Sequence, residues 1–438
     1  MSFDKYPAYK SSSLKWLGDI PESWELKRLK HLFSLVKRPV QEGNGIVTCF
    51  RDGTVTLRSK RRTEGFTNAV QEIGYQRVCA GDLVIHAMDA FAGAIGVSDS
   101  DGKSSPVYSV CVPKSQQTVL TEYYGKLLRN MALSGFVASL AKGIRERSTD
   151  FRWSDAGEIF LPVPSIHEQT QIARFLDHET AKIDALIREQ ERLIELLQEK
   201  RQAVISHAVT KGLDPDVPMK VSGVEWLGEV PAHWNVMPLK WRAISRSGDG
   251  LASQTIESAE SPEKSIPVIG GNGVMGYISE ANLQPPAIVL GRVGALCGNV
   301  HTITEPAWVT DNALIIQFDD WAFDGSYLSN LLRARNLNEI ADRTAQPLIT
   351  GSKVRDQFIV IPPLSEQKAI NVWLEDNKKR FDNLLSESDR LISVLKERRA
   401  ALISAAVTGK IDVRNWQPPS DESAFDEDVR QAGMEVTA

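Results

Sequence analysis

The sequence predicts a mixed α/β protein built as one half-molecule written twice: two α/β domains joined by two long helices, related by a pseudo-twofold internal repeat. Three observations predict this organisation. A short tryptophan-containing motif occurs twice, a long helical segment occurs twice, and the segments between these repeats mix strand-like and helix-like patterns.

The repeats set the expected order of the chain. The short motif reads WLGDIPESWELKRLK at 16–30 and WLGEVPAHWNVMPLK at 226–240. The long repeat covers 168–214 and 366–412, and its identities include Glu168, Asp184 and Arg201, which recur as Glu366, Asp382 and Arg399. We therefore expect a first domain at 1–165, a first long helix at 166–212, a second domain at 213–363, a second long helix at 364–412, and an acidic, disordered tail at 413–438.

The long repeat has the composition of a helix, because 168–210 contain neither glycine nor proline. Its apolar side chains recur at spacings of three, four and seven, the pattern of a coiled-coil seam. The expected seam residues are Leu176, Ile183, Ile187, Leu193, Leu197 and Val204 in the first helix, and Leu374, Phe381, Leu385, Leu391, Leu395 and Leu402 in the second.

Two packing arrangements fit this pattern: each helix packs on its own domain, or the two helices pair with each other. A helix of about 40 residues is about 60 Å long. A domain of about 120 residues has a radius of only about 14 Å, so it cannot cover such a helix. We therefore favour an antiparallel coiled coil that acts as a rigid spacer with one domain at each end.

The variable segments carry short strand and helix patterns. Alternating apolar residues predict strands, and apolar residues at helical spacing predict helices. The expected strands are 77–87, 107–112, 266–270, 287–291 and 313–318, and the expected helices are 121–140 and 327–340.

Composition indicates a reduced, cytoplasmic protein. The net charge is −5, and the last 24 residues hold six acids and one base, so the rest of the chain is close to neutral. No run of 18 apolar residues and no signal-peptide core is present, which argues against a membrane partner. The four cysteines are far apart and form no Cys-x-x-Cys pair.

Basic residues cluster in expected loops, where they can neutralise phosphates or read guanine. A solvated charged surface explains the 58–62 cluster equally well, and a simple turn explains Gly270–Gly273 equally well. The candidate DNA-contacting residues are Arg58, Lys60, Arg61, Arg62, Arg145, Arg147 and Arg152 in the first domain, and Asn272, Tyr277, Arg292, Lys353 and Arg355 in the second.

Signatures of catalysis are missing from the sequence. There is no Asn-Pro-Pro-Tyr or Asp-Pro-Pro-Tyr methyltransferase motif, no phosphate-binding loop, no dinucleotide fingerprint and no histidine spacing suited to a metal. We therefore expect a binding protein with no catalytic residues, no metal site and no cofactor of its own.

The doubled order of WLG-x-x-P-x-x-W motif, variable domain, proline-rich segment (LPVPSIHEQ at 161–169, IPPLSEQ at 361–367) and long helix resembles the specificity subunit of type I restriction-modification systems. The resemblance covers about residues 13–412. It implies that each variable domain is a target recognition domain reading one half of a split, asymmetric double-stranded DNA sequence. A stand-alone DNA-binding regulator of the same architecture is the alternative.

The resemblance also implies partners. Two modification (methyltransferase) subunits dock on the helices and methylate adenine, and restriction (motor-nuclease) subunits join them. S-adenosylmethionine, ATP and magnesium are expected on these partners. The expected docking residues are Trp16, Trp24, Trp226, Trp234, Leu193, Leu197, Leu391 and Leu395.

Overall fold

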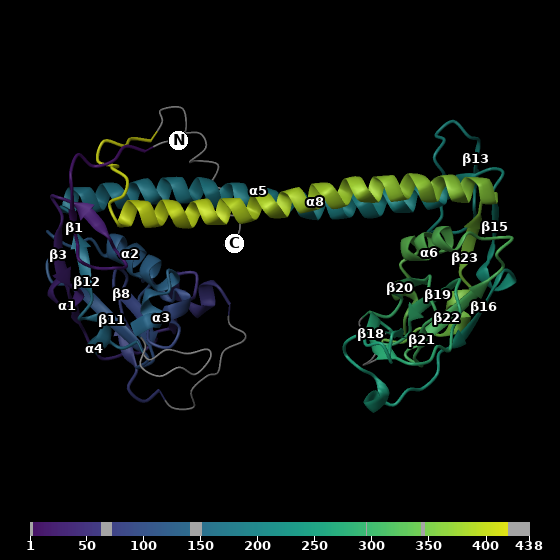
Figure 1. Ribbon diagram of the computed structural model, residues 1–438, viewed down its shortest axis with the longest axis horizontal. Coiled ribbons are helices and arrows are strands. Elements are labelled where there is room, and N and C mark those ends of the chain that lie inside the picture. The colour runs from purple at the N-terminus through teal and green to yellow at the C-terminus, as the bar shows by residue number, and fades with distance from the viewer. Residues whose placement is uncertain (1–2, 63–71, 141–150, 295, 343–346, 419–438) are drawn as a thin grey trace. The chain divides into compact units, whose positions relative to one another are not determined.

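The computed structural model describes residues 3–62, 72–140, 151–294, 296–342 and 347–418, and it confirms a mixed α/β fold (Figure 1). The chain forms two compact units. The first unit combines the residues up to Gln190 with those from Arg390 onward, and the second unit is Glu191–Asp389. Each unit therefore contains part of both long helices.

The first unit is built on a four-stranded antiparallel sheet in the order β4-β11-β8-β9. Helix α2 packs against β8 and β9. Smaller antiparallel pairs are β1/β2, β3/β12, β5/β6 and β7/β10. The strands are β1 Tyr9–Ser11, β2 Asp19–Pro21, β3 Glu25–Arg28, β4 Phe33–Leu35, β5 Val47–Cys49, β6 Val55–Leu57, β7 Gln76–Val78, β8 Leu83–His86, β9 Ile95–Val97, β10 Gly102–Ser104, β11 Tyr108–Pro113 and β12 Phe160–Val163; the helices are α1 Leu29–Leu32, α2 Thr121–Leu133, α3 Phe136–Leu140 and α4 Trp153–Ala156.

The second unit has a four-stranded antiparallel sheet of the same kind, in the order β16-β22-β19-β20, with α6 packed against β19 and β20. Two pairs, β13/β14 and β15/β23, accompany it, together with a three-stranded sheet β18-β17-β21. The strands are β13 Met219–Val221, β14 Glu229–Pro231, β15 Asn235–Pro238, β16 Ala243–Ser247, β17 Ile266–Gly270, β18 Gly273–Ile278, β19 Ala287–Gly291, β20 Val300–Ile303, β21 Trp308–Val309, β22 Ala313–Phe318 and β23 Phe358–Ile361; the helices are α6 Gly325–Ala334 and α7 Gly351–Arg355.

The expected strands in the second unit are confirmed with their bounds, whereas three expected elements are interrupted. The strand expected at 77–87 is two strands separated by a turn at Gly81, where φ is +87°. The helix expected at 121–140 ends at Leu133 and resumes at Phe136, with Gly135 at φ +84° between them. The helix expected at 327–340 ends at Ala334, before Asn336 at φ +50°. A left-handed residue cannot continue a right-handed helix, which explains the last two breaks.

The two long helices are α5 Ile166–Lys211 and α8 Leu364–Val407. In the first unit, Asp184 of α5 forms an ion pair with Arg399 of α8, with Oδ1 2.8 Å from Nε. In the second unit, Asp382 of α8 forms an ion pair with Arg201 of α5, with Oδ1 3.0 Å from Nη1. These are the same two repeat positions with the helices exchanged. No helix among the described residues is long and apolar enough to cross a membrane.

Burial along the helices corrects one detail of the expected seam. In α5, Leu193 is 41% exposed and the next residue, Ile194, is half-buried. In α8, Leu391 is 42% exposed and the next residue, Ile392, is only 8% exposed. Both copies place two apolar residues side by side at this point, so spacing alone did not fix the phase of the seam. The regular alternation of three and four residues that includes Ile187 and Leu395 passes through the isoleucines.

Gly409, two residues after the end of α8, provides a test of how this end of the helix packs on the first unit. Gly409 has φ +73°, and a Cβ atom there would lie 2.5 Å from Cδ of Pro21. We expect Gly409→Ala to lower the free energy of unfolding by about 1–2 kcal/mol from the left-handed backbone and by about another 1–3 kcal/mol from overpacking.

The matched control is Gly81→Ala. Gly81 has φ +87° and nothing within 4 Å of the added Cβ, so only the backbone cost applies. Urea denaturation of both variants measures the difference. Equal losses would contradict close packing of Gly409 on Pro21.

Candidate nucleic-acid and partner-binding surfaces

The first tryptophan-containing motif ends in a fully buried side chain, Trp24. Its indole Nε1 donates to Oε1 of Glu168 at 2.9 Å, and the Tyr6 hydroxyl donates to the same oxygen at 2.6 Å. Burial, reinforced by Glu168, raises the pKa of Tyr6 well above its usual range, so the phenol stays protonated and remains a donor. Two donors therefore satisfy a carboxylate that is only 7% exposed.

The second copy repeats this arrangement. Trp234 is fully buried, and its Nε1 donates to Oε2 of Glu366 at 2.8 Å. Here the second contact comes from His233, whose Nε2 lies 2.7 Å from Oε1 of Glu366. In each unit the tryptophan also packs near the glycine that ends the other long helix, Gly409 for Trp24 and Gly212 for Trp234.

A second repeated contact joins the short helices to the ends of the long ones. The Tyr123 hydroxyl donates to the carbonyl of Val407 at 3.0 Å, and the Tyr327 hydroxyl donates to the carbonyl of Val209 at 2.8 Å. Carbonyls in the last turn of a helix lack a partner within the helix, so these bonds stabilise its end. The sequence does contain a signal for this pair, because Tyr-x-x-x-Leu-Leu-Arg occurs at both 123–129 and 327–333. The reading of the sequence missed that signal.

A glutamine beside each glutamate completes the repeated frame. Gln169 Nε2 donates to the carbonyl of Pro164 at 2.9 Å, and its Oε1 accepts from the backbone N–H of Leu120 at 2.8 Å. Gln367 makes the equivalent bonds to the carbonyl of Pro362 at 2.9 Å and to the N–H of Asp324 at 2.8 Å. Each glutamine is fully buried and ties the start of a long helix to the start of a short one.

These contacts change the interpretation of the expected docking residues. Trp24 and Trp234 are buried in the cores of their units, and Leu395 is buried on α8, so none of the three offers a surface to a partner. Three others are half-buried: Trp16 packs beside Phe136, the Trp226 indole donates to the carbonyl of Phe358, and Leu197 lies on α5. Leu193 and Leu391 are exposed.

Leu193 and Leu391 belong to a repeated set of exposed apolar residues on the long helices. The set also includes positions seven residues before and three residues after each of them. Its members, between 41% and 53% exposed, are Leu186, Leu193 and Leu196 on α5, and Leu384, Leu391 and Val394 on α8.

Several cations of the first basic cluster have partners within the unit. Arg61 forms an ion pair with Asp52 at 2.6 Å, and its guanidinium lies 4.2 Å from the ring centroid of Phe50. The hydrogen bond to Asp52 raises the pKa of Arg61. Arg58 donates to the Thr48 hydroxyl at 2.9 Å, and Lys60 donates to the Ser100 hydroxyl at 2.8 Å.

The rest of the first-domain candidates are less informative. Arg62 is exposed and follows this turn, and Arg152 is exposed at the start of α4. Arg145 and Arg147 lie outside the described residues. The cluster at 58–62 is therefore a turn braced by local contacts, with charged side chains still half to fully accessible.

The second-unit candidates come from three different places in the fold. Asn272 lies exposed in the β17–β18 turn, and Tyr277 lies half-buried on β18. Arg292 follows β19 and donates to the Ser247 hydroxyl at 2.7 Å. Lys353 and Arg355 lie on α7, where Lys353 forms an ion pair with Asp342 at 2.5 Å. Within the described residues, no group of three or more His, Cys, Asp or Glu side chains is arranged to hold a metal ion.

The comparisons with known proteins agree on one family. A family model described as the type I restriction modification DNA specificity domain matches residues 251–388. The EcoprrI specificity subunit of Escherichia coli is 30% identical over 144 residues, which is 32% of this chain and 33% of that protein. The MjaVIII specificity subunit of Methanocaldococcus jannaschii is 25% identical and covers 93% of this chain and 98% of that protein.

Solved structures share the fold. A chain from a structural study of complex assembly and conformational transition of the type I R-M system has a TM-score of 0.64 at 16% identity, over 89% of this chain and 98% of that one. The HsdS subunit from Thermoanaerobacter tengcongensis has a TM-score of 0.51 at 15% identity, over 92% and 100%. In sequence the chain is similar to type I restriction-modification specificity subunits, at 30% identity over one third of its length and at 25% identity over 93% of it.

The buried tryptophans generate a stability prediction. Trp24→Phe removes one of two donors to a carboxylate that has little access to water, so we expect a loss of about 1–3 kcal/mol in the free energy of unfolding. Trp234→Phe is the matched variant. We expect a smaller loss there, because the Glu366 side chain is 39% exposed and retains His233. Thermal denaturation of the two variants checks the order, and a larger loss for Trp234→Phe would contradict it.

Proposed function

We propose that this chain is the sequence-reading subunit of a type I restriction-modification complex, in which each variable domain binds one half of a bipartite, asymmetric DNA target. The observation that carries the proposal is the combination of a repeated frame with unlike attachments. The Trp–Glu, Tyr–carbonyl and Gln contacts recur in both units. Two strand pairs outside the four-stranded sheets recur, β1/β2 with β13/β14 and β3/β12 with β15/β23, but the remaining strands differ: the pairs β5/β6 and β7/β10 in one unit and a three-stranded sheet in the other.

Unlike surfaces on like frames favour recognition of two different half-sites. The candidate contacts are the basic turn at 58–62, Arg145, Arg147 and Arg152 in the first domain, and Asn272, Tyr277, Arg292, Lys353 and Arg355 in the second. Phosphate contacts made by such residues position a protein on DNA, and base contacts specify the sequence. Half-exposed cations with a single local acid, such as Arg61 with Asp52, can exchange that acid for a phosphate.

The two long helices form an antiparallel coiled coil with pseudo-twofold symmetry in this proposal, and they set the distance between the half-sites. The exchanged ion pairs Asp184–Arg399 and Asp382–Arg201 support antiparallel pairing. The domains are then 1–165 and 213–363, and the helices 166–212 and 364–412. The acidic tail expected at 413–438 is not disordered from its start, because Val413 is buried in the core of the first unit and Trp416 packs on Phe175.

The partners in this proposal are two methyltransferase subunits and the restriction subunits, all in the cytoplasm. S-adenosylmethionine, ATP and magnesium belong to these partners, and this chain performs no catalysis itself. The exposed apolar residues of the long helices support a docking role, because solvent-facing leucines at matching repeat positions fit two copies of one partner. The half-buried Trp16 and Trp226 are the remaining docking candidates.

Methylome sequencing tests the proposal. In cells that carry this gene beside its methyltransferase, we expect a split motif methylated at adenine, and we expect that motif to disappear on deletion of the gene. Complementation with the intact gene is the control. A regulator would leave the methylome unchanged and bind its site without a methyltransferase, which would contradict the proposal.

The spacer role makes a separate prediction. Inserting four helix-forming residues into each long helix lengthens the spacer by about 6 Å. Since successive base pairs are about 3.4 Å apart, we expect the recognised half-sites to be unchanged and the gap between them to grow by one or two base pairs. The methylated motif of cells that express the insertion variant reports both the half-sites and the gap. An unchanged gap would contradict the proposal that the helices set the distance between the half-sites.

A further inference from the structure

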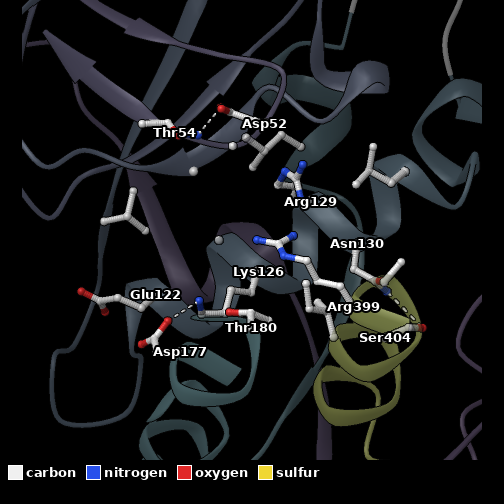
Figure 2. Close-up of a pocket in the computed structure, with 18 of the residues that line it drawn as sticks. Asp52, Thr54, Glu122, Lys126, Arg129, Asn130, Asp177, Thr180, Arg399 and Ser404 are labelled. Atoms are coloured by element: carbon white, nitrogen blue, oxygen red, sulfur yellow. Dashed lines mark hydrogen bonds and ion pairs between the residues drawn. The ribbon is translucent and has the colours of Figure 1, made fainter. Parts of the chain in front are cut away.

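The first unit contains a cavity of about 730 Å³ between α2, the 52–54 turn, β9 and the adjoining parts of α5 and α8 (Figure 2). Cations from two helices line it: Lys126 and Arg129 from α2, and Lys396 and Arg399 from α8. Figure 2 shows the guanidinium groups of Arg129 and Arg399 pointing into this space.

Arg129 is held in place without a counter-ion. Its stem lies over Gly53, where an added Cβ would meet Arg129 Cδ at 2.5 Å. Its Nη2 reaches the Arg51 carbonyl only at 3.5 Å, and its Nε is buried without a hydrogen-bond partner. No carboxylate within the described part of the chain forms an ion pair with it. Burial, and then the nearby charge of Arg399, lower the pKa of Arg129, and Asp52 opposes this effect more weakly.

Most of the acidic side chains that line the cavity already form ion pairs with other cations. Asp177 forms an ion pair with Lys126 at 2.6 Å, and Asp52 forms one with Arg61 at 2.6 Å. Arg399 is paired with Asp184. Arg129 and Lys396 therefore face a single uncommitted acid, Glu122, on the cavity wall. A guanidinium that is desolvated and close to a second one is unfavourable unless an anion binds between them.

We propose that this cavity binds a phosphate group, held between the guanidinium groups of Arg129 and Arg399 with Lys396 beside them. Arginine forks match the geometry of phosphate oxygens. The cavity is much larger than one ion, and Ile95, Val97 and Ile403 give it apolar wall, so the phosphate belongs to an organic molecule. That molecule is either a free phosphorylated metabolite or the DNA backbone.

The second unit provides a matched control residue, Arg333, at the equivalent position of the Tyr-x-x-x-Leu-Leu-Arg sequence. Its guanidinium donates to the carbonyl of Val300 and to Oδ1 of Asn330, both at 3.1 Å. Burial lowers the pKa of Arg333 as well, and no second arginine contributes to that shift. Substitution of Arg333 therefore removes a similar side chain without removing a paired guanidinium site.

The test is calorimetric titration of the full-length chain with sodium pyrophosphate at low ionic strength. We expect one saturable site and at least a tenfold loss of affinity in Arg129→Met, which keeps the unbranched stem over Gly53. Arg333→Met should change the affinity less than twofold. Lys396→Met, at an exposed position that carries no packing role, should weaken binding severalfold and guards against misfolding of the Arg129 variant.

A second arm identifies the source of the phosphate, and only this arm rests on the proposed function. Two results together assign the site to the DNA backbone. Duplex DNA displaces pyrophosphate, and the slope of log DNA affinity against log salt concentration falls by about one in Arg129→Met. Pyrophosphate binding without displacement assigns it to a free phosphorylated ligand. Pyrophosphate binding in a chain that binds no DNA in any complex would refute the proposed function and leave the site standing. Absence of saturable pyrophosphate binding, or equal weakening by Arg129→Met and Arg333→Met, would overturn the site.

Discussion

The hydrogen bond from a buried tryptophan to the glutamate at the start of a long helix is the contact on which each unit depends. Trp24 and Glu168 form it in the first unit, and Trp234 and Glu366 form it in the second. The glutamate charge also suits the positive end of the helix dipole. The same tryptophan also packs near the glycine that ends the other long helix. One side chain therefore contacts the start of one long helix and the end of the other.

This frame explains how two different domains are carried by one design. The four-stranded sheets have matching order, and α2 and α6 cover matching strands. The strand arrangement differs outside those sheets, with β5/β6 and β7/β10 in the first unit and the three-stranded sheet β18-β17-β21 in the second. A protein organised in this way can change what a domain touches while the residues that position the domain stay the same.

Much of the fold could be predicted from the sequence, because the duplicated helices carry long apolar periodicity and the strands 266–270, 287–291 and 313–318 are compact runs of apolar, often β-branched residues. The phase of the apolar seam could not be predicted, because the adjacent Leu193 and Ile194 each fit the spacing of three and four residues. The sequence also could not predict which charged groups surround the candidate arginines. The charge that lies beside each arginine depends on residues that only the fold brings together. Arg61 lies beside the acid Asp52 on a turn, whereas Arg129 lies near a second cation, Arg399, on a distant helix.

The interleaving of the helices also orders the folding of the chain during synthesis. The second unit is one continuous stretch, whereas the core of the first includes Ala406, Val407 and Val413 from near the end of the sequence. At a synthesis rate of about 5–20 residues per second, the first domain emerges from the ribosome well before the segment that closes its core. The first unit is thus completed after the second, and during that interval the apolar side chains around Trp24 and Tyr123 lack the cover that Val407 and Gly409 provide.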